Sequence, residues 1–456
     1  MRPVMLRAPQ ATALLGALLL VTPAAMAVAQ ATPVVAPVAA DEARPIALRE
    51  AITLAQRNAP AVVQARGLER NAEANYRSAR GAYIPSLSLS AGTARTQGVQ
   101  FFQGQLVPLT GNPWNYNNGL SATLQLFDGN QRWSEIQRVK ATQRVADVTT
   151  TQAQFDAELQ VKQQYYAALA ARESEAAARA QLEQAQQQLR ASAARVAAGV
   201  ATKSDSLRSA IQVGNAQLAV LTSQNDLRVA NAALTRVIGS STTVTALPED
   251  TLDTVQPLPT EADLASYVAT GPAVLLAEAN LASALASRKS QRSAYLPTLS
   301  MTYSYAFTQS SKTFSGSDIW LFSGGNPNRQ NLNFNLSYQI FNGFTREGQS
   351  VQQDVAVANA EASLRDARLA VRATLTTLLR SLQNAQARVQ VQLAAIAASE
   401  EDLRVQQQRY NLGASTLLDL LTSQTQLNQA RQSLIQARFD GRVARAQLAS
   451  LIGRPL

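Results

Sequence analysis

The segment Arg409-Tyr-Asn-Leu-Gly-Ala-Ser-Thr-Leu-Leu-Asp419 separates two long stretches whose apolar residues follow a helical period. The segment Arg195-Val-Ala-Ala-Gly-Val-Ala-Thr-Lys-Ser-Asp205 has the same frame 214 positions earlier, with glycine and aspartate in matching places. Glycine readily adopts the positive φ at which many helices end. Gly199 and Gly413 are therefore predicted to form the turns of two helical hairpins.

Two further motifs repeat at nearly the same spacing. Tyr83-Ile-Pro-Ser-Leu-Ser88 returns as Tyr295-Leu-Pro-Thr-Leu-Ser300, and Phe127-Asp-Gly129 returns as Phe341-Asn-Gly343. The pattern before the first motif is helical, apolar and polar residues alternate between the two motifs, and the helical period returns after the second. The chain thus consists of two copies of one unit: short helix, strand, loop, strand, long helix, turn and return helix.

The repeat boundaries follow from these motifs. Repeat 1 is predicted over residues 47–239 and repeat 2 over residues 263–456, with an equatorial linker rich in Ser, Thr and Pro at residues 240–262. Repeat 1 is expected to contain strands at 84–98 and 116–128, a long helix at 131–198 and a return helix at 202–238. Repeat 2 is expected to contain strands at 296–309 and 330–341, a long helix at 345–411 and a return helix at 416–452.

The long helices are the unusual element. At 1.5 Å per residue each would be about 100 Å long. A seven-residue spacing of leucines, seen in the second return helix at Leu420, Leu427 and Leu434, indicates coiled-coil packing. The two shorter helices of each unit together match its long helix in length, so we expect them to lie end to end beside it.

The N-terminal segment has the pattern of a secretory signal. Arg2 and Arg7 precede an apolar stretch at Ala11–Val21, and small residues follow near residues 25–31. We predict a signal peptide at residues 1–31 and a flexible leader at residues 32–46. No later run is expected to reach the roughly 20 apolar residues that a membrane-spanning helix needs.

Composition excludes several kinds of chemistry. The chain contains neither Cys nor His, which rules out disulfides, zinc sites built on those residues and a Ser-His-Asp triad. We find no phosphate-binding glycine loop or nucleophile–base pair, so we expect no enzyme and no cofactor. The net charge of +10 comes from arginines spread along the helices, and this distribution predicts no nucleic-acid partner.

The strands allow two interpretations. Their faces alternate between apolar side chains and Ser, Thr, Asn or Gln, which suits a sandwich with one solvated face or a membrane barrel with a wet interior. Four strands cannot close a barrel, for which about eight is the smallest common number. If the strands lie in a membrane, several chains must close the barrel together, and three chains would supply twelve strands.

The duplicated order of these motifs resembles the TolC family of outer membrane efflux proteins over roughly residues 45–456. The resemblance implies a mainly α fold with four strands per chain, assembled as a homotrimer. In such a trimer a twelve-stranded transmembrane β-barrel is continued by a long α-helical barrel across the periplasm. It also implies a passive exit duct in the outer membrane that works with a periplasmic adaptor protein and an inner-membrane pump of the RND or ABC type.

The same resemblance suggests residues for a gate at the periplasmic end. Asp419 matches an aspartate that lines the constriction, and Thr422 stands where a second aspartate is expected. Tyr410 and Asp205 match a pair that holds the gate closed, and Ser415 replaces a basic residue of that gate. The turns at Gly199 and Gly413 would contact the adaptor.

Simpler explanations remain open for these residues and for the whole chain. Asp205 follows Thr202 by three positions and could complete a capping box, and Asp419 could favour the positive end of its helix dipole. The long helices would also suit a non-membrane coiled-coil interaction protein in the periplasm or on the cell surface. Within the duct interpretation, the cargo could be small molecules or a protein exported by type I secretion.

Overall fold

The computed structural model describes residues 43–108, 114–247, 261–314 and 328–454 of the 456-residue chain. Ala43–Leu456 forms one compact unit. The predicted signal peptide and residues 32–42 of the predicted leader lie outside the described residues.

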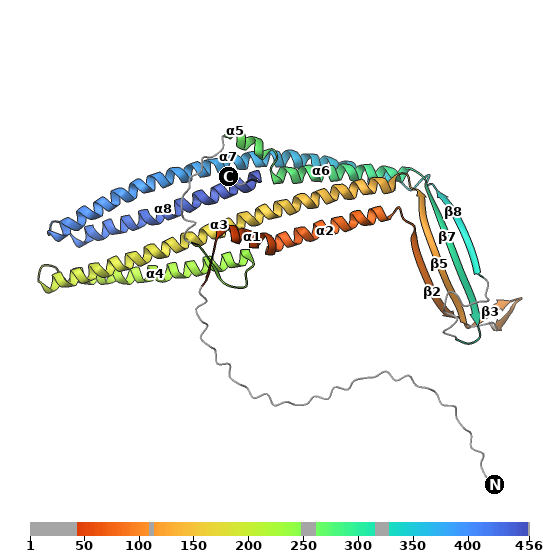
Figure 1. Cartoon of the computed structure of the whole chain (residues 1–456), viewed down its shortest axis with the longest axis horizontal. Helices are drawn as coiled ribbons and strands as arrows, with labels where there is room; N and C mark the ends of the chain where they lie inside the picture. The colour runs from red at the N-terminus through yellow and green to blue at the C-terminus, as the bar shows by residue number, and fades with distance from the viewer. Residues whose placement is uncertain (1–42, 109–113, 248–260, 315–327, 455–456) are drawn as a thin grey trace, which may run out of the picture. The chain divides into compact units, whose positions relative to one another are not determined.

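Helices make up most of both repeats (Figure 1). Repeat 1 contains α1 (Leu48–Asn58), α2 (Pro60–Gly81), α3 (Gln131–Ala197) and α4 (Lys203–Ile238). Repeat 2 contains α5 (Glu261–Val268), α6 (Pro272–Gln291), the short 3-10 helix η2 (Arg292–Tyr295), α7 (Thr345–Asn411) and α8 (Leu417–Ile452). The long helices α3 and α7 have 67 residues each, and the return helices α4 and α8 have 36 each. The helical hairpins of the two repeats therefore have equal helix lengths.

Helix α3 contacts helices of both repeats. It contacts α2 and α4 of its own repeat and α6 and α8 of the other repeat, while α7 contacts α6 and α8. In Figure 1, α2 and α4 follow one another along α3, and α6 and α8 follow one another along α7. Each long helix thus has two shorter helices beside it, so the hairpin ends of both repeats lie at the same end of the helical part.

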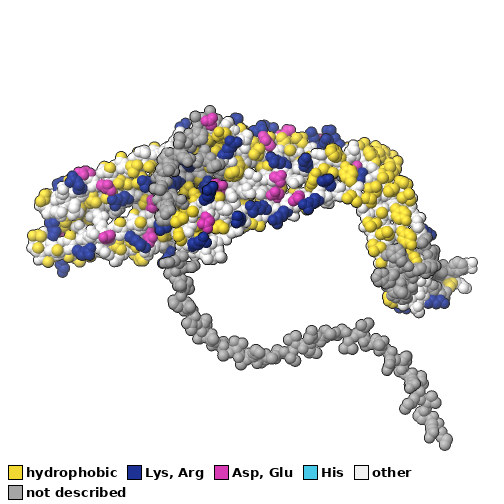
Figure 2. All heavy atoms as spheres, in the orientation of Figure 1, with side chains coloured by type: hydrophobic (Ala, Val, Ile, Leu, Met, Phe, Trp, Pro, Cys, Tyr) yellow, Lys and Arg dark blue, Asp and Glu magenta, His cyan; other side chains and the backbone are white. Residues whose placement is uncertain are grey.

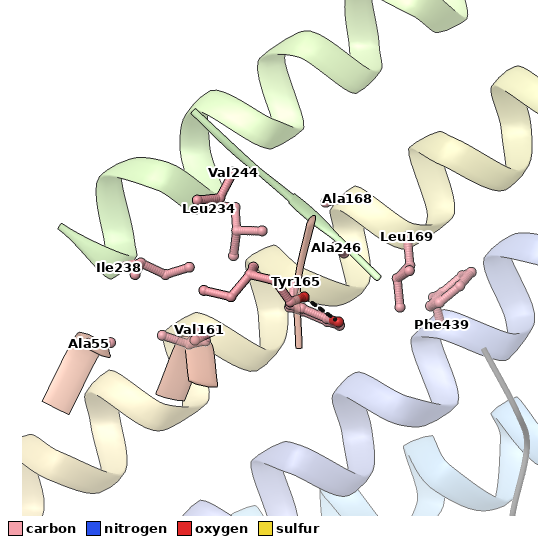
Figure 3. Close-up of a cluster of buried hydrophobic side chains, with 12 residues drawn as sticks. Ala55, Val161, Tyr165, Ala168, Leu169, Leu234, Ile238, Val244, Ala246 and Phe439 are labelled. Atoms are coloured by element: carbon pink, nitrogen blue, oxygen red, sulfur yellow. Dashed lines mark hydrogen bonds between the residues drawn. The ribbon is translucent and has the colours of Figure 1, made fainter. Parts of the chain in front are cut away.

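Two short strands tie the start of the described chain to the segment after α4. β1 (Arg44–Ile46) pairs in parallel with β6 (Val244–Ala246). The Tyr165 hydroxyl, on α3, donates to the Ile46 carbonyl at 3.0 Å and accepts from the Leu247 N–H at 3.1 Å. Figure 3 shows this tyrosine among the buried apolar side chains of the surrounding cluster.

These strands correct the predicted leader and linker. Residues 44–46 of the predicted leader and 244–246 of the predicted linker are ordered strands. Ile46, Val244 and Ala246 are each no more than 2% exposed. Burial of these apolar side chains, together with the backbone hydrogen bonds, stabilises three-residue strands that would not hold on their own.

The four longest strands form one antiparallel sheet. Its order is β2-β5-β7-β8, with β2 (Ser86–Arg95) and β8 (Asn328–Ser337) at the edges and β5 (Trp114–Phe127) and β7 (Thr298–Ser311) inside. The first predicted strand, 84–98, is shorter than expected. Residues 99–108 of the predicted loop form a separate hairpin of β3 (Val99–Phe102) and β4 (Gln105–Pro108). Gln103 and Gly104 have φ of 49° and 84°, the positive values that a tight hairpin turn requires.

The two faces of the sheet differ in polarity, as the alternation predicted. On one face Ser88 hydrogen-bonds Ser121 at 2.6 Å, and Thr123 hydrogen-bonds Thr302 at 3.3 Å. The other face presents large apolar side chains to the surroundings, including Leu87, Leu89, Leu332, Phe334 and Leu336, which are 57–70% exposed. Figure 2 shows hydrophobic side chains gathered over the part of the surface that the sheet forms. A sheet with an exposed apolar face is suited to a lipid environment.

One helical segment corrects the expectation that no later run could cross a membrane. Within the described residues, Asp263–Tyr295 is long and apolar enough by length and composition. The segment is not one continuous helix, because α5 ends at Val268 and α6 begins at Pro272. At the break the backbone lies close to α8, since a Cβ added to Gly271 would be 2.6 Å from the Leu451 carbonyl oxygen. Beyond the break, α6 packs against α3 and α7.

A candidate gate at the hairpin ends

Both hairpins turn with the same backbone geometry. Gly199 and Gly413 have φ of 76° and 77°. The N–H of Val200 bonds the Arg195 carbonyl at 3.0 Å, and the N–H of Ala414 bonds the Arg409 carbonyl at 2.8 Å. This pattern is the Schellman motif, in which a left-handed residue lets the chain satisfy the last helix carbonyls. Apart from the adjoining residues, no described atom lies within 4 Å of a Cβ added to either glycine, so backbone conformation rather than lack of space calls for glycine here.

A capping box starts each return helix. The Thr202 side chain accepts from the Asp205 N–H, and the Asp205 carboxylate accepts from the Thr202 N–H at 3.1 Å. Thr416 and Asp419 make the same pair, with the Thr416 N–H donating to Asp419 at 3.0 Å. The Thr416-x-x-Asp419 spacing is a capping signal that our reading of the second hairpin missed. Both candidate aspartates therefore have a structural role in their own helix.

The hydrogen bonds from Thr416 also lower the pKa of the Asp419 carboxyl. The backbone N–H of Thr416 and then its hydroxyl, with a smaller contribution from nearby Arg409, hold the pKa of the Asp419 carboxyl below its usual value. The side chain is exposed at the end of the hairpin. Asp419 thus presents a permanent negative charge at neutral pH.

At the hairpin ends, Arg195 of the first hairpin contacts Tyr410 of the second. The Arg195 guanidinium lies 4.5 Å from the centre of the Tyr410 ring, and its Nη1 donates to the Tyr410 carbonyl at 3.1 Å. Tyr410 is only 6% exposed and packs with Leu417 and Leu420 of α8. Arg195 opens the first quoted turn segment, but our interpretation gave it no role, because only the packing of the hairpins brings it to Tyr410.

The predicted pair of Tyr410 and Asp205 is not joined in the structure of the chain. The Tyr410 hydroxyl is buried and makes no hydrogen bond to any described residue. The described hydrogen bonds of the Asp205 carboxylate go to Thr202. The capping box uses the Asp205 carboxylate, and the group that contacts the Tyr410 ring is the Arg195 guanidinium.

Thr422 and its surroundings complete the second hairpin end. Thr422 is exposed on α8, and its hydroxyl donates to the Leu418 carbonyl at 2.9 Å. The next residue, Ser423, is buried and donates to the carboxylate of Asp402 on α7 at 2.5 Å. Asp402 is a second acidic group near the hairpin end that the motifs did not indicate.

Glutamines line the space between the hairpins above their ends. A small cavity of about 20 Å³ lies between α3, α4 and α8 and is bordered by Gln181, Gln184, Gln188, Gln212 and Gln424 among others. Gln188 is 8% exposed, and its amide nitrogen has no hydrogen-bond partner in the described chain. Such a volume has room for about one water molecule. At this level the hairpins therefore meet in part through glutamine side chains. Among the described residues, no cluster of three or more carboxylates could hold a metal ion.

The two-faced sheet and the long paired hairpins define a class of membrane channel subunit. A family model described as outer membrane efflux protein matches residues 51–240 and 267–454. The chain belongs to this family.

Curated relatives and solved structures agree with this assignment. Protein CyaE of Bordetella pertussis is 30% identical over 420 residues, covering 88% of this chain and 84% of that protein. Outer membrane protein TolC of Escherichia coli is 22% identical, covering 82% of this chain and 76% of that protein. The fold matches outer membrane protein VceC of Vibrio cholerae with a TM-score of 0.72 at 15% identity, covering 90% of this chain and 96% of that one. The open-state MtrE outer membrane channel of Neisseria gonorrhoeae also matches with a TM-score of 0.72, at 19% identity and 89% coverage of each chain.

These findings confirm the predicted class. The protein is a passive exit duct of the outer membrane with a periplasmic helical extension, and it is not an enzyme. Proteins of this family are trimeric channels that work with adaptor and inner-membrane pump partners. The alternative of a non-membrane coiled-coil protein is therefore wrong.

Proposed function

We propose that three copies of this chain form one duct whose periplasmic end is gated by the hairpin ends at Gly199 and Gly413. The edges of the sheet support the trimer. Within the described sheet, β2 and β8 each pair with a neighbouring strand on one side only. Open strand edges are costly in lipid, where unpaired backbone groups find no water. Pairing β8 of one copy with β2 of the next removes all such edges.

The helices of neighbouring copies could pack head to tail in the same way as the strands. Along it, α2 and α4 lie on one side of α3, and α7 lies beyond α6 and α8. The outer columns carry exposed apolar side chains, including Leu218, Leu221 and Val229 of α4 and Val355, Leu369 and Val391 of α7. Joining these columns between copies would bury the apolar side chains and close a ring of helices.

The gate is proposed at the second hairpin. Three copies of Asp419 would bring three permanent negative charges to the constriction, with the exposed hydroxyl of Thr422 one turn further along α8. Arg195 and Tyr410 hold the second hairpin against the first within each copy. Glutamines border the cavity beside this contact, and we expect the Arg195–Tyr410 contact to determine how readily the hairpin ends separate and the gate opens.

The partners follow from the same geometry. The turns at Gly199 and Gly413 are the outermost points of the hairpins and would contact a periplasmic adaptor, behind which an inner-membrane pump of the RND or ABC type supplies the energy. We propose small-molecule efflux as the function of the assembly. A strain lacking the protein should lose resistance to members of a panel of drugs, dyes and metals; unchanged resistance with loss of a secreted protein would favour type I secretion.

One observation carries the gate, namely that Asp419 is exposed and charged at a hairpin end joined to its neighbour by Arg195. Because the chain has no cysteine, single-cysteine variants give a direct test. Asp419→Cys channels in planar bilayers should lose conductance when a charged thiol reagent is added from the periplasmic side. Asp205→Cys is the matched control, because it removes the same capping carboxylate from the first hairpin. Equal loss of conductance in both variants, or no loss in either, would contradict a constriction at Asp419.

A further inference from the structure

The strands meet the long helices at two duplicated junctions, and the first is internally neutralised. The Arg132 guanidinium lies 4.6 Å from the centre of the Tyr83 ring. Its Nε donates to the Asp128 carboxylate at 2.8 Å, and the Arg132 N–H donates to the same oxygen at 2.9 Å. The side chains of Arg132 and Asp128 are 16% and 10% exposed. The first junction thus pairs its arginine with a buried carboxylate.

The second junction keeps the arginine and loses the carboxylate. Arg346 lies 5.0 Å from the centre of the Tyr295 ring and donates to the Gln339 and Ile340 carbonyls at 3.0 and 3.2 Å. Asn342 stands where Asp128 stands in repeat 1. Within the described chain, Nε of Arg346 and Oδ1 of Asn342 are buried without hydrogen-bond partners. No described carboxylate lies within ion-pair distance of Arg346, so its positive charge is uncompensated.

Large apolar side chains surround this uncompensated arginine. Ile340, Phe341 and Phe344 are 82%, 69% and 71% exposed, and the two phenylalanine rings meet edge to face with centres 5.4 Å apart. The position of Phe344 in repeat 1 is occupied by Asn130. The second junction therefore combines a cation with an exposed aromatic and aliphatic surface, whereas the first has a closed ion pair.

The place of the junction identifies the partner chemistry. The protein lies in the outer membrane and its helices extend into the periplasm, so the strand–helix junctions lie at the periplasmic surface of the lipid. A phospholipid presents a phosphate at that level and acyl chains just inside it. We propose that Arg346 of each copy binds the headgroup of an anionic phospholipid, whose acyl chains lie against Ile340, Phe341 and Phe344.

Native mass spectrometry of the purified full-length trimer can test this site. Trimers would be released from nanodiscs of equal parts phosphatidylglycerol and phosphatidylethanolamine. A single arginine near a membrane surface contributes about 1 kcal/mol, so the wild type should favour phosphatidylglycerol about fivefold at up to three bound lipids per trimer. Arg346→Gln should remove this preference. Arg365→Gln, which removes one charge from an exposed position of the same helix α7, should leave it unchanged.

A second variant keeps the arginine in place. Asn342→Asp recreates the carboxylate of the first junction and should neutralise Arg346 internally, which would abolish the preference for phosphatidylglycerol while preserving the fold. Equal retention of phosphatidylglycerol by the wild type and Asn342→Asp would overturn the proposal. Loss of the trimer in Arg346→Gln, with lipid preference unaltered in Asn342→Asp, would overturn it in favour of a contact with a neighbouring copy.

Discussion

The guanidinium of Arg195 stacks on the ring of Tyr410, with 4.5 Å between the charge centre and the ring centre, and joins helix ends that are 215 residues apart in the chain. The contact uses the ring face and the backbone carbonyl of the tyrosine. It leaves the Tyr410 hydroxyl without a hydrogen bond in the described chain. This contact therefore depends on a cation, an aromatic face and a backbone carbonyl, and not on the phenol hydroxyl.

Arg195→Gln should open the duct more often. A cation–π contact contributes about 0.5–2 kcal/mol, so losing it should raise the ratio of open to closed states by about 2- to 30-fold per contact. Single-channel recording in planar bilayers would measure this as a higher open probability. Tyr410→Phe keeps the ring and is the matched control, with gating close to the wild type. If Tyr410→Phe opened the duct as much as Arg195→Gln, a hydrogen bond of the hydroxyl to another copy would have to hold the gate.

The selectivity of the duct for cations should persist to mildly acidic pH. Hydrogen bonds from Thr416 hold the folded-state pKa of Asp419 below its usual value, which is about 4 for an aspartate. The capping stabilisation is therefore complete above the unfolded-state pKa and is lost only as the pH falls through the lower folded-state pKa. Reversal potentials in a KCl gradient should be the same at pH 7 and pH 5.

Variants of the two capping aspartates should distinguish an effect on cation selectivity from an effect on helix stability. Replacing either by asparagine should cost up to about 1 kcal/mol of helix stability, because asparagine keeps only part of the cap. Only Asp419→Asn should reduce cation selectivity, since Asp205 belongs to the other hairpin. A fall in selectivity of the same size in Asp205→Asn would show that both hairpins line the constriction.

Tyr165→Phe should loosen the start of the folded chain. The substitution removes both hydrogen bonds of the Tyr165 hydroxyl and leaves the Ile46 carbonyl and the Leu247 N–H with only their own mutual bond of 3.2 Å. A lost hydrogen bond costs about 0.5–1.5 kcal/mol. Limited proteolysis should then cleave ahead of α1 faster than in the wild type. Tyr76→Phe on α2, where the ring contacts Arg80, is the control and should not change the cleavage rate.

Gly129 and Gly343 should differ in their tolerance of alanine although they occupy equivalent positions. Both have φ of 65°, but a Cβ on Gly129 would lie 2.5 Å from Cβ of Leu296, whereas no described atom beyond the adjoining residues lies within 4 Å of a Cβ on Gly343. Gly343→Ala should cost only the left-handed strain of about 1–2 kcal/mol. Gly129→Ala should cost about 1–3 kcal/mol more from overpacking. Comparable thermal midpoints for the two purified variants would contradict this difference.

Much of the hairpin geometry could be predicted from short sequence signals. The long helix of repeat 2 spans the predicted residues 345–411, because Gly343 and Gly413 adopt positive φ on either side of it. The return helices begin where Thr202 and Thr416 meet an aspartate three residues later. Alternating side chains likewise predicted which face of the sheet is polar. These signals act within a few residues, so the sequence displays them directly.

Contacts between segments far apart in the chain could not be predicted from such local signals. β1 and β6 have three residues each, too few for a periodic pattern, and they exist because Tyr165 and a buried apolar cluster hold them. Tyr410 and Asp205, which were predicted to pair, do lie at the same end of the helical part. The Asp205 carboxylate, however, accepts hydrogen bonds from Thr202, and the Tyr410 ring contacts the Arg195 guanidinium.

The sequence by itself determined the duplication, the hairpin turns and the two-faced strands, because glycine conformation, helix capping and side-chain alternation are local properties of the chain. Only the tertiary structure decided which residues join the hairpins and how the two strand–helix junctions differ. Arg195 reaches Tyr410 because α3 and α7 have the same length and end at the same level. The Asp128 carboxylate forms an ion pair with Arg132, whereas Asn342 cannot compensate the charge of Arg346. The sequence shows the Asp-to-Asn difference, but only the structure shows that each of these side chains lies beside its arginine.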